Sequence, residues 1–310
     1  MFFKMTYVTR DLDLGNDEVT LHSADSTIEL TWRKRTAGEK HYQSGDGVCV
    51  ASCARKLSDR LEEEARNTGN LSIKKESVDE VHDEMYRFIA RTLRLIRWRT
   101  NLSGGHDPIR LFLGFAWSLD SVDWKEVLDT VHLELSVDLV RLVRPDIRSS
   151  IEQLILEDQE EPFAHELLRE AYSYRRESAR SAIVFAVAAA EVGFKRFVAK
   201  MAPDTSWLIE NIPSPPLVLM LKELLPNLRV VYRIQGTEPA VPASMLDGLK
   251  KAVLLRNQIV HGRAESIKNS TLNATLLLVR DFLYLLDFYA GTSWAADNVT
   301  PETIQALAGP

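Results

Sequence analysis

The chain has 310 residues, 45% of them hydrophobic, which allows one large or two ordinary globular domains with well-filled cores. Its formal net charge is −6, and residues 1–150, with 22 basic and 25 acidic side chains, carry −3 of it. Neither half of the chain is therefore a basic domain that would bind polyanions nonspecifically. Cysteine occurs only at positions 49 and 53, which excludes a disulfide framework and indicates a reducing compartment.

No targeting or membrane-spanning segment is expected. Residues 1–13 lack a basic region followed by an extended apolar core, so they do not resemble a secretory signal. The most apolar stretch, 181–193, lies between Arg180 and Lys195 and is shorter than the roughly 20 residues that a membrane helix needs. We therefore expect a soluble, cytoplasmic protein without a membrane partner.

The chain up to about Ala54 has the pattern of short strands joined by turns. Residues 18–22 and 27–33 alternate partly between apolar and polar side chains and contain Val, Ile, Thr and Trp. A Gly-Asp-Gly sequence at 45–47 predicts a further turn before the apolar run 48–51. The N-terminal part is therefore expected to contain β structure.

The two cysteines do not make up a recognisable metal site. Cys49 and Cys53 could join His41 in a metal site, but two thiols and one distant histidine fall short of a structural zinc set. Apart from His261, the histidines show no metal-ligand or catalytic-triad spacing, and no phosphate-cradling glycine loop or G-x-S-x-G element occurs. We expect two ordinary thiols, no metal and no cofactor.

Two helices are predicted next. Residues 54–66 form a plausible helix, and 77–99 form a second, which Ser77 can cap and in which Asp79 and Glu80 occupy the first turn. Its arginines lie toward its C-terminal end, where the helix dipole favours cations.

This second helix carries an arginine stripe, Arg87, Arg91 and Arg94, interleaved with apolar side chains. The stripe could track a phosphate backbone. It could equally be a solvated face or a contact between domains, with Asp83 and Arg87 as an i to i+4 pair. The second interpretation is the favoured one.

Residues 111–117 are a nearly continuous apolar run of strand length. The pattern over 127–142 is ambiguous between helix and strand, and 148–156 continues as helix. An acidic, proline-containing link at 157–162 follows.

We place the domain boundary in that link. Residues 1–157 are expected to form a mixed α/β domain that senses a trigger, selects RNA or regulates activity. Residues 158–310 are expected to be all helical, so that the whole chain is of the α+β class.

Two long helical patterns dominate the C-terminal region. The first covers 164–202, with an alanine-rich apolar middle and Gly193 as its only interruption, and the second covers 270–290. Loops are expected at 212–216 and 232–242, where proline is frequent.

An acidic residue, Glu191, lies within the apolar part of the first pattern, where a carboxylate is costly unless it is paired. It could contact Arg256 or His261 across the helices. An ion pair with Lys195 at the i to i+4 spacing is the simpler interpretation and is preferred.

The segment 254–262, LLRNQIVHG, is the most informative stretch of the chain. Asn257 and His261 are four residues apart and share a helix face, whereas Arg256 and His261 would be roughly 140° apart in an unbroken helix. Gly262 is the expected left-handed stop, which would place His261 in or beside the last turn.

These three side chains suit cleavage of a phosphodiester without a metal. His261 can act as general acid or base near neutral pH. Arg256 can hold a phosphate through paired donors and stabilise charge in the transition state. Asn257 can orient the imidazole or the phosphate. The alternative is that the polar residues merely cap the helix.

The sequence R-N-Q-I-V-H at 256–261 resembles the signature of HEPN domains, an arginine, often followed by asparagine, and a histidine a few residues later. The order of helical patterns over 161–291 is similar to that family's layout. The resemblance implies a helical bundle, commonly dimeric, in which two copies of the motif form one composite site. It also implies a metal-independent endoribonuclease of toxin, antiphage or RNA-processing systems.

We therefore expect a homodimeric ribonuclease that acts on RNA, with Arg256, Asn257 and His261 as its catalytic residues and an antitoxin or other regulatory protein as a further partner. The alternative, from a different functional class, is a noncatalytic HEPN-like module for binding or dimerisation.

Overall fold

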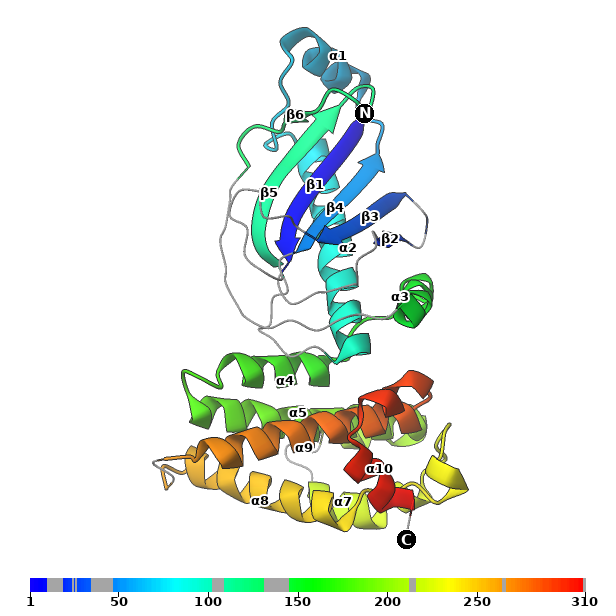
Figure 1. Cartoon of the computed structure of the whole chain (residues 1–310), viewed down its shortest axis with the longest axis vertical. Coiled ribbons are helices and arrows are strands. Elements are labelled where there is room, and N and C mark those ends of the chain that lie inside the picture. Colours follow the sequence, from blue (N-terminus) through cyan, green and yellow to red (C-terminus); the bar gives the residue numbers. More distant parts are fainter. Residues whose placement is uncertain are drawn as a thin grey trace. The chain divides into compact units, whose positions relative to one another are not determined.

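The computed structural model describes residues 1–9, 19–23, 25, 27–34, 47–101, 109–130, 145–211, 216–263 and 266–308. The chain divides into two compact units, Met1–Glu161 and Pro162–Pro310. The first contains an antiparallel sheet with helices, and every described secondary-structure element of the second is a helix (Figure 1). The expected α+β class is confirmed.

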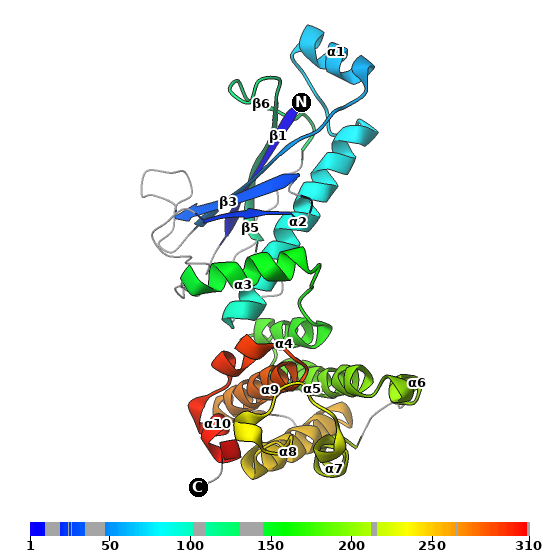
Figure 2. The same ribbon diagram turned by 90° about the vertical axis from the view of Figure 1, so that its right-hand side faces the viewer.

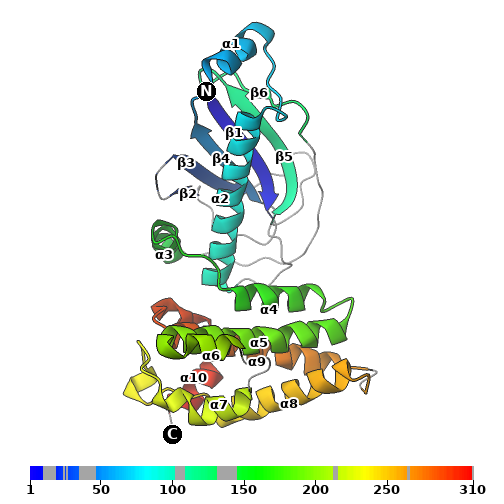
Figure 3. The ribbon, with the colours of Figure 1, turned by 180° about the vertical axis from the view of Figure 1, so that it is seen from behind.

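The described elements of the first unit are β1 (Phe2–Thr9), β2 (Val19–His22), β3 (Ile28–Lys34), β4 (Gly47–Ala54), α1 (Asp59–Thr68), α2 (Glu76–Thr100), β5 (Ile109–Ser118), β6 (Lys125–Glu126) and α3 (Pro145–Leu156). The strands form one sheet in the order β2-β3-β4-β1-β5-β6, and every neighbouring pair is antiparallel. Helix α2 crosses one face of this sheet (Figure 3).

Side-chain alternation places the core of this unit between the sheet and α2. Phe3, Met5 and Tyr7 alternate along β1 and are buried. The Tyr7 ring lies 6.2 Å from the ring of Tyr86 on α2. These contacts follow from the period-2 pattern, which directs every second residue of a strand toward the helix.

The strands predicted at 18–22 and 27–33 are confirmed as β2 and β3. Two predicted helix starts were wrong. Helix α1 begins at Asp59 because the Ser58 side chain caps it by accepting from the Leu61 N–H, and α2 begins after Lys75, so Ser77 is not its cap. Most of the ambiguous segment 127–142 lies outside the described residues.

The described elements of the second unit are α4 (Phe163–Ser173), α5 (Ala179–Met201), η1 (Pro203–Thr205), α6 (Ser206–Asn211), α7 (Leu217–Glu223), η2 (Leu225–Asn227), η3 (Ile234–Gly236), α8 (Ala243–Val260), α9 (Asn269–Tyr289), η4 (Ser293–Asn298) and α10 (Pro301–Ala308). Helix α5 packs against α4, α8 and α9 (Figure 2). Within the described ranges, no helix has both the length and the apolar content to cross a bilayer.

The single helix expected over 164–202 is two helices, α4 and α5. The chain turns after Tyr174, and Ser178 caps α5 by accepting a 3.2 Å hydrogen bond from the Ser181 N–H. Gly193, the expected weak point, lies inside α5 without breaking it. A Cβ atom there would lie 2.4 Å from Cδ2 of Leu283, so this glycine allows α5 and α9 to approach closely.

Candidate functional site

The C-terminal end of α8 carries the three predicted site residues. Gly262 has φ +69°, its N–H donates to the Ile259 carbonyl at 3.0 Å, and the Arg263 N–H donates to the Gln258 carbonyl at 2.7 Å. This pair of bonds is the Schellman arrangement, in which a left-handed residue ends a helix. The predicted stop at Gly262 is confirmed, and His261 is the last residue before the chain leaves the helix.

The three side chains do not all face the same way. Arg256 is half-buried, with 22% of its side chain exposed, whereas Asn257 and His261 are exposed. Asn257 and His261 therefore share an outer face of α8, as their spacing predicts, and Arg256 faces α5. The unbroken helix up to Val260 keeps Arg256 and His261 on different faces.

Glu191 of α5 is the partner of Arg256. Arg256 Nη2 donates to Glu191 Oε1 at 2.6 Å, and the Glu191 side chain is only 13% exposed. The preferred interpretation, a pair between Glu191 and Lys195, is replaced by this contact across the bundle. Burial raises the pKa of the Glu191 carboxyl above its usual range, and the charge and hydrogen bond of Arg256 offset part of that rise, with Lys195 the last contributor.

The ion pair occupies only part of the Arg256 guanidinium. Among the described residues Nη2 has a hydrogen-bond acceptor, and Nε is buried without one. A guanidinium carries five N–H donors, and since the buried Nε is out of a ligand's reach, the Nη groups keep the capacity for a second anionic group. Glu191 fixes the side chain through a charge-assisted bond while those donors remain.

The part of α8 and its cap that the structure describes gives neither the Asn257 amide nor the His261 imidazole a hydrogen-bond partner. Asn257 instead holds His261 through the main chain, because its carbonyl accepts the His261 N–H at 3.0 Å. The exposed imidazole is thus carried on a fixed backbone, which suits proton transfer to a bound ligand.

The arginine stripe of α2 is engaged within its own unit. Arg91 donates to the Gln159 carbonyl at 2.8 Å and pairs with Asp158 at 2.7 Å. Arg87 donates to the Asp83 carbonyl at 3.2 Å. These contacts favour the structural interpretation of the stripe, since Arg91 ties α2 to the segment after α3.

Both thiols lie on β4 and are buried. Burial raises the pKa of Cys49 above its usual range and that of Cys53 to about 11. A thiol in this state is a poor nucleophile and a poor ligand, because both roles need the thiolate. His41, the histidine that could join these thiols in a metal site, lies outside the described residues.

The structure brings together two groups of side chains that were not predicted from the sequence. Asp79, His82 and Asp83 on α2 bring ligand atoms within 4.8 Å of one another, and their i, i+3, i+4 spacing was the signal. Both carboxylates are exposed, and His82 Nδ1 lies 3.3 Å from Asp83 Oδ1. The cluster could accept a divalent cation at a surface position.

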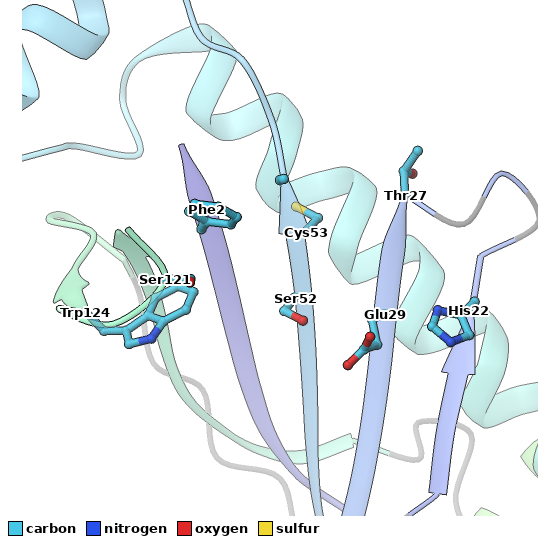
Figure 4. A pocket seen from close by; sticks show the side chains of 9 residues that line it. Phe2, His22, Thr27, Glu29, Ser52, Cys53, Ser121 and Trp124 are labelled. Carbon is cyan, nitrogen blue, oxygen red and sulfur yellow. The ribbon is translucent and has the colours of Figure 1, made fainter. Parts of the chain in front are cut away.

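The second group lines an open hollow of about 480 Å³ on the sheet (Figure 4). Phe2 and Trp124 form its aromatic end, with the Lys4 ammonium 4.2 Å from the Trp124 ring centroid. His22 and Glu29, cross-strand partners on β2 and β3, form its polar end. Strand alternation was the signal that would have grouped them.

No protein-family model matches this chain, and no curated protein or solved structure is detectably similar to it. The geometry of the site is therefore the basis for assigning a function.

Proposed function

We propose that the protein is a metal-independent endoribonuclease of HEPN type, with the second unit as a HEPN-like helical bundle. It acts in the cytoplasm as a homodimer, in a toxin or antiphage system, under the control of an antitoxin or other regulatory protein. The first unit senses the trigger, selects the RNA or regulates the site.

His261 is the general acid or base in this reaction. It takes the proton of a ribose 2′-hydroxyl, whose oxygen attacks the adjacent phosphorus while the bond to the 5′-oxygen of the next nucleotide breaks, and that leaving oxygen takes up a proton from solvent water. Arg256 stabilises the additional negative charge on the phosphoryl oxygens, and Asn257 positions the phosphate. The products are a 2′,3′-cyclic phosphate, or the 3′-phosphate formed by its hydrolysis, and a 5′-hydroxyl.

The observation that carries the proposal is the arrangement at the end of α8. An arginine held by a partly buried carboxylate precedes an exposed asparagine and an exposed histidine at a fixed helix end. A cationic group and a proton-transferring group are what phosphodiester cleavage needs when no metal takes part. Because Arg256 and His261 lie on different faces of α8, the composite site of the proposed homodimer is what brings both groups to one phosphate.

Cleavage of total RNA in the presence of EDTA tests the proposal. We expect His261→Ala and Arg256→Ala to lower the cleavage rate by about 100-fold or more. Arg280→Ala is the matched control, because Arg280 is also half-buried and pairs with a carboxylate, Asp281, at 2.7 Å. Undiminished cleavage by both site variants would overturn the assignment.

A noncatalytic binding or dimerisation module is the second candidate, and the Arg256–Glu191 pair favours it. That contact joins α8 to α5, so Arg256 has a structural role whether or not it meets a phosphate. In this case purified protein leaves RNA intact with and without EDTA, while Arg256→Ala lowers the free energy of unfolding.

A further inference from the structure

One face of the sheet in the first unit is turned away from α2. Phe3, Met5 and Tyr7 point toward α2, so strand alternation directs Phe2 and Lys4 of the same strand to the opposite face. Figure 4 views this opposite face, with α2 behind the sheet. The hollow of about 480 Å³ therefore lies on the face that α2 does not cover.

Strand register lines up one row of side chains across this face. From β2 to β6 the row consists of His22, Glu29, Ser52, Lys4, Ala116 and Glu126. Directly opposite residues of antiparallel strands point to the same side, so all of these side chains share one face. Glu29 and Lys4 are two strand spacings apart, about 10 Å at the backbone, with the small Ser52 between them. That small side chain leaves the space that forms the middle of the hollow.

The two sides of this space differ in chemistry. Glu29 is exposed, and its carboxylate has no hydrogen-bond or ion-pair partner in the part of the chain that the structure describes. On the other side Phe2 is 36% exposed, and the Lys4 ammonium lies 4.2 Å from the centroid of the Trp124 ring. A planar ring that stacks on these aromatic side chains has a carboxylate at its edge and an ammonium beside it. His22 lies beyond Glu29, outside this space.

We propose that this part of the hollow binds a guanine base of single-stranded RNA. Phe2 and Trp124 stack against the base, Glu29 accepts hydrogen bonds from its edge, and the Lys4 ammonium meets a phosphate of the same strand. The use of this site to choose the substrate rests on the proposed function, whereas the binding itself requires no cleavage.

The carboxylate determines which base fits. An ionised carboxylate only accepts hydrogen bonds, and it does so through two neighbouring oxygens. Guanine presents two neighbouring donors on its Watson–Crick edge, the ring N–H and the exocyclic amine, and satisfies both oxygens. Adenine, cytosine and uracil each place an acceptor beside the donor that would meet Glu29, and the carboxylate repels that acceptor.

The charge of the row favours a nucleotide within a strand over a free nucleoside triphosphate. Lys4 is the one lysine or arginine of the row, and Glu29 adds a negative charge beside it. A single ammonium matches the single phosphate charge of a nucleotide in RNA, whereas a triphosphate concentrates several negative charges. Stacking and the contacts to the base edge then supply most of the affinity.

Binding of short 2′-O-methyl oligonucleotides to the full-length protein tests the site without cleavage, because their blocked 2′-oxygens cannot attack phosphorus. By fluorescence anisotropy, UUGUU should bind at least tenfold more tightly than UUAUU. Inosine in place of the guanine lacks only the exocyclic amine and should bind about tenfold more weakly than guanine. Equal affinities for the three oligonucleotides would overturn the inference without any substitution in the protein.

Glu29→Gln tests the carboxylate from the side of the protein. A carboxamide offers one donor and one acceptor, so this variant should lose the preference for guanine over adenine. Glu126→Gln is the matched control, because Glu126 is an exposed glutamate at the far end of the same row. An equal effect of both substitutions would contradict the assigned contact.

Phe2→Leu tests the stacking surface, because it removes the ring and keeps an apolar side chain. We expect it to weaken binding of all three oligonucleotides about tenfold. Phe163→Leu is the control, since Phe163 is a 43% exposed phenylalanine of the second unit. Unchanged binding by the Phe2 variant would contradict stacking at this site.

Cleavage of ordinary RNA separates this inference from the proposed function. Glu29→Gln should raise KM for guanine-containing RNA about tenfold and leave kcat unchanged, because Glu29 does not touch the reacting bonds; an unchanged KM would overturn the role in selection. Guanine-dependent binding by a protein that leaves RNA intact contradicts the proposed function alone. Cleavage through His261 without a guanine preference in binding, or GTP binding as tight as that of UUGUU, contradicts this inference alone.

Discussion

The contact between Arg256 and Glu191 determines how both residues behave. A carboxylate that is 13% exposed loses much of its hydration, and the guanidinium 2.6 Å away compensates for part of that loss. The pair therefore couples the electrostatics of α5 to the residue that is expected to meet a phosphate. Any substitution of Arg256 will change stability as well as activity.

Arg256→Ala is expected to lower the free energy of unfolding by about 2 kcal/mol at pH 8, because it leaves a partly buried carboxylate without its partner. The pKa of Glu191 is already raised above its ordinary value of 4.5, and loss of Arg256 raises it further. When the pKa of a carboxyl is higher in the folded state than in the unfolded state, the free energy of unfolding falls as the pH rises from the unfolded-state pKa to the folded-state pKa. The deficit should therefore grow from pH 4.5 upward, as measured by urea denaturation.

The double substitution Glu191→Gln with Arg256→Ala provides the control for this prediction. It removes the ionisable group, so the extra loss at high pH should disappear. A deficit that is the same at pH 4.5 and pH 8 would show that Arg256 stabilises α8 by packing and not through the carboxylate.

Gly262 determines where helix α8 ends and therefore where the His261 side chain is placed. Its φ of +69° strains any residue with a Cβ atom, although among the described residues no atom beyond the two adjacent residues lies within 4 Å of a Cβ placed there. Gly262→Ala is expected to cost about 1 kcal/mol from backbone conformation alone. Gly262→Asn should cost less, because asparagine adopts this conformation more readily. Equal thermal stability of the alanine variant and the wild type would contradict the assigned conformation.

These two residues also show what the sequence could predict. A glycine after an apolar periodic run indicates a helix stop by local geometry alone, so Gly262 and the position of His261 were predictable. The partner of Glu191 was not, because Arg256 lies 65 residues away and only helix packing brings it near. Local spacing favoured Lys195 in its place.

At the scale of elements, the break between α4 and α5 was missed because apolar periodicity continues on both sides of it. In the structure Ser178 caps α5, so a new helix begins there. The Tyr174 ring, in the turn before it, stacks on the Phe185 ring with the centroids 5.4 Å apart. A serine can lie inside a helix or cap one, so its sequence position does not decide between them. The strands, in contrast, were predictable from alternation and turn residues.

Helix α5 depends on Gly193 for its approach to α9. A Cβ atom would lie 2.4 Å from Leu283 Cδ2 and 3.2 Å from the Ala164 Cβ, so Gly193→Ala requires the buried Leu283 side chain, and to a smaller extent α4 at Ala164, to shift. We expect a loss of about 1–3 kcal/mol despite the better helix propensity of alanine. Thermal denaturation would contradict this packing if the variant melted at or above the wild-type temperature.

At the scale of the whole molecule, the α+β class followed from the change of period along the chain, from alternating residues to helical spacing. The order of the strands could not be predicted in the same way, because β1 lies between β4 and β5 and contacts over long sequence distances decide that order. For the first unit we propose a role in sensing the trigger, selecting the RNA or regulating the site.

The chemistry of the products tests the central claim most directly. With EDTA present, RNA incubated with the purified protein should yield fragments that carry a 5′-hydroxyl and a 2′,3′-cyclic phosphate or 3′-phosphate, identified by end-labelling and mass spectrometry. His261→Ala should abolish these fragments while His22→Ala, which removes another exposed imidazole, should not. Intact RNA, or fragments with 5′-phosphate and 3′-hydroxyl ends, would contradict the account.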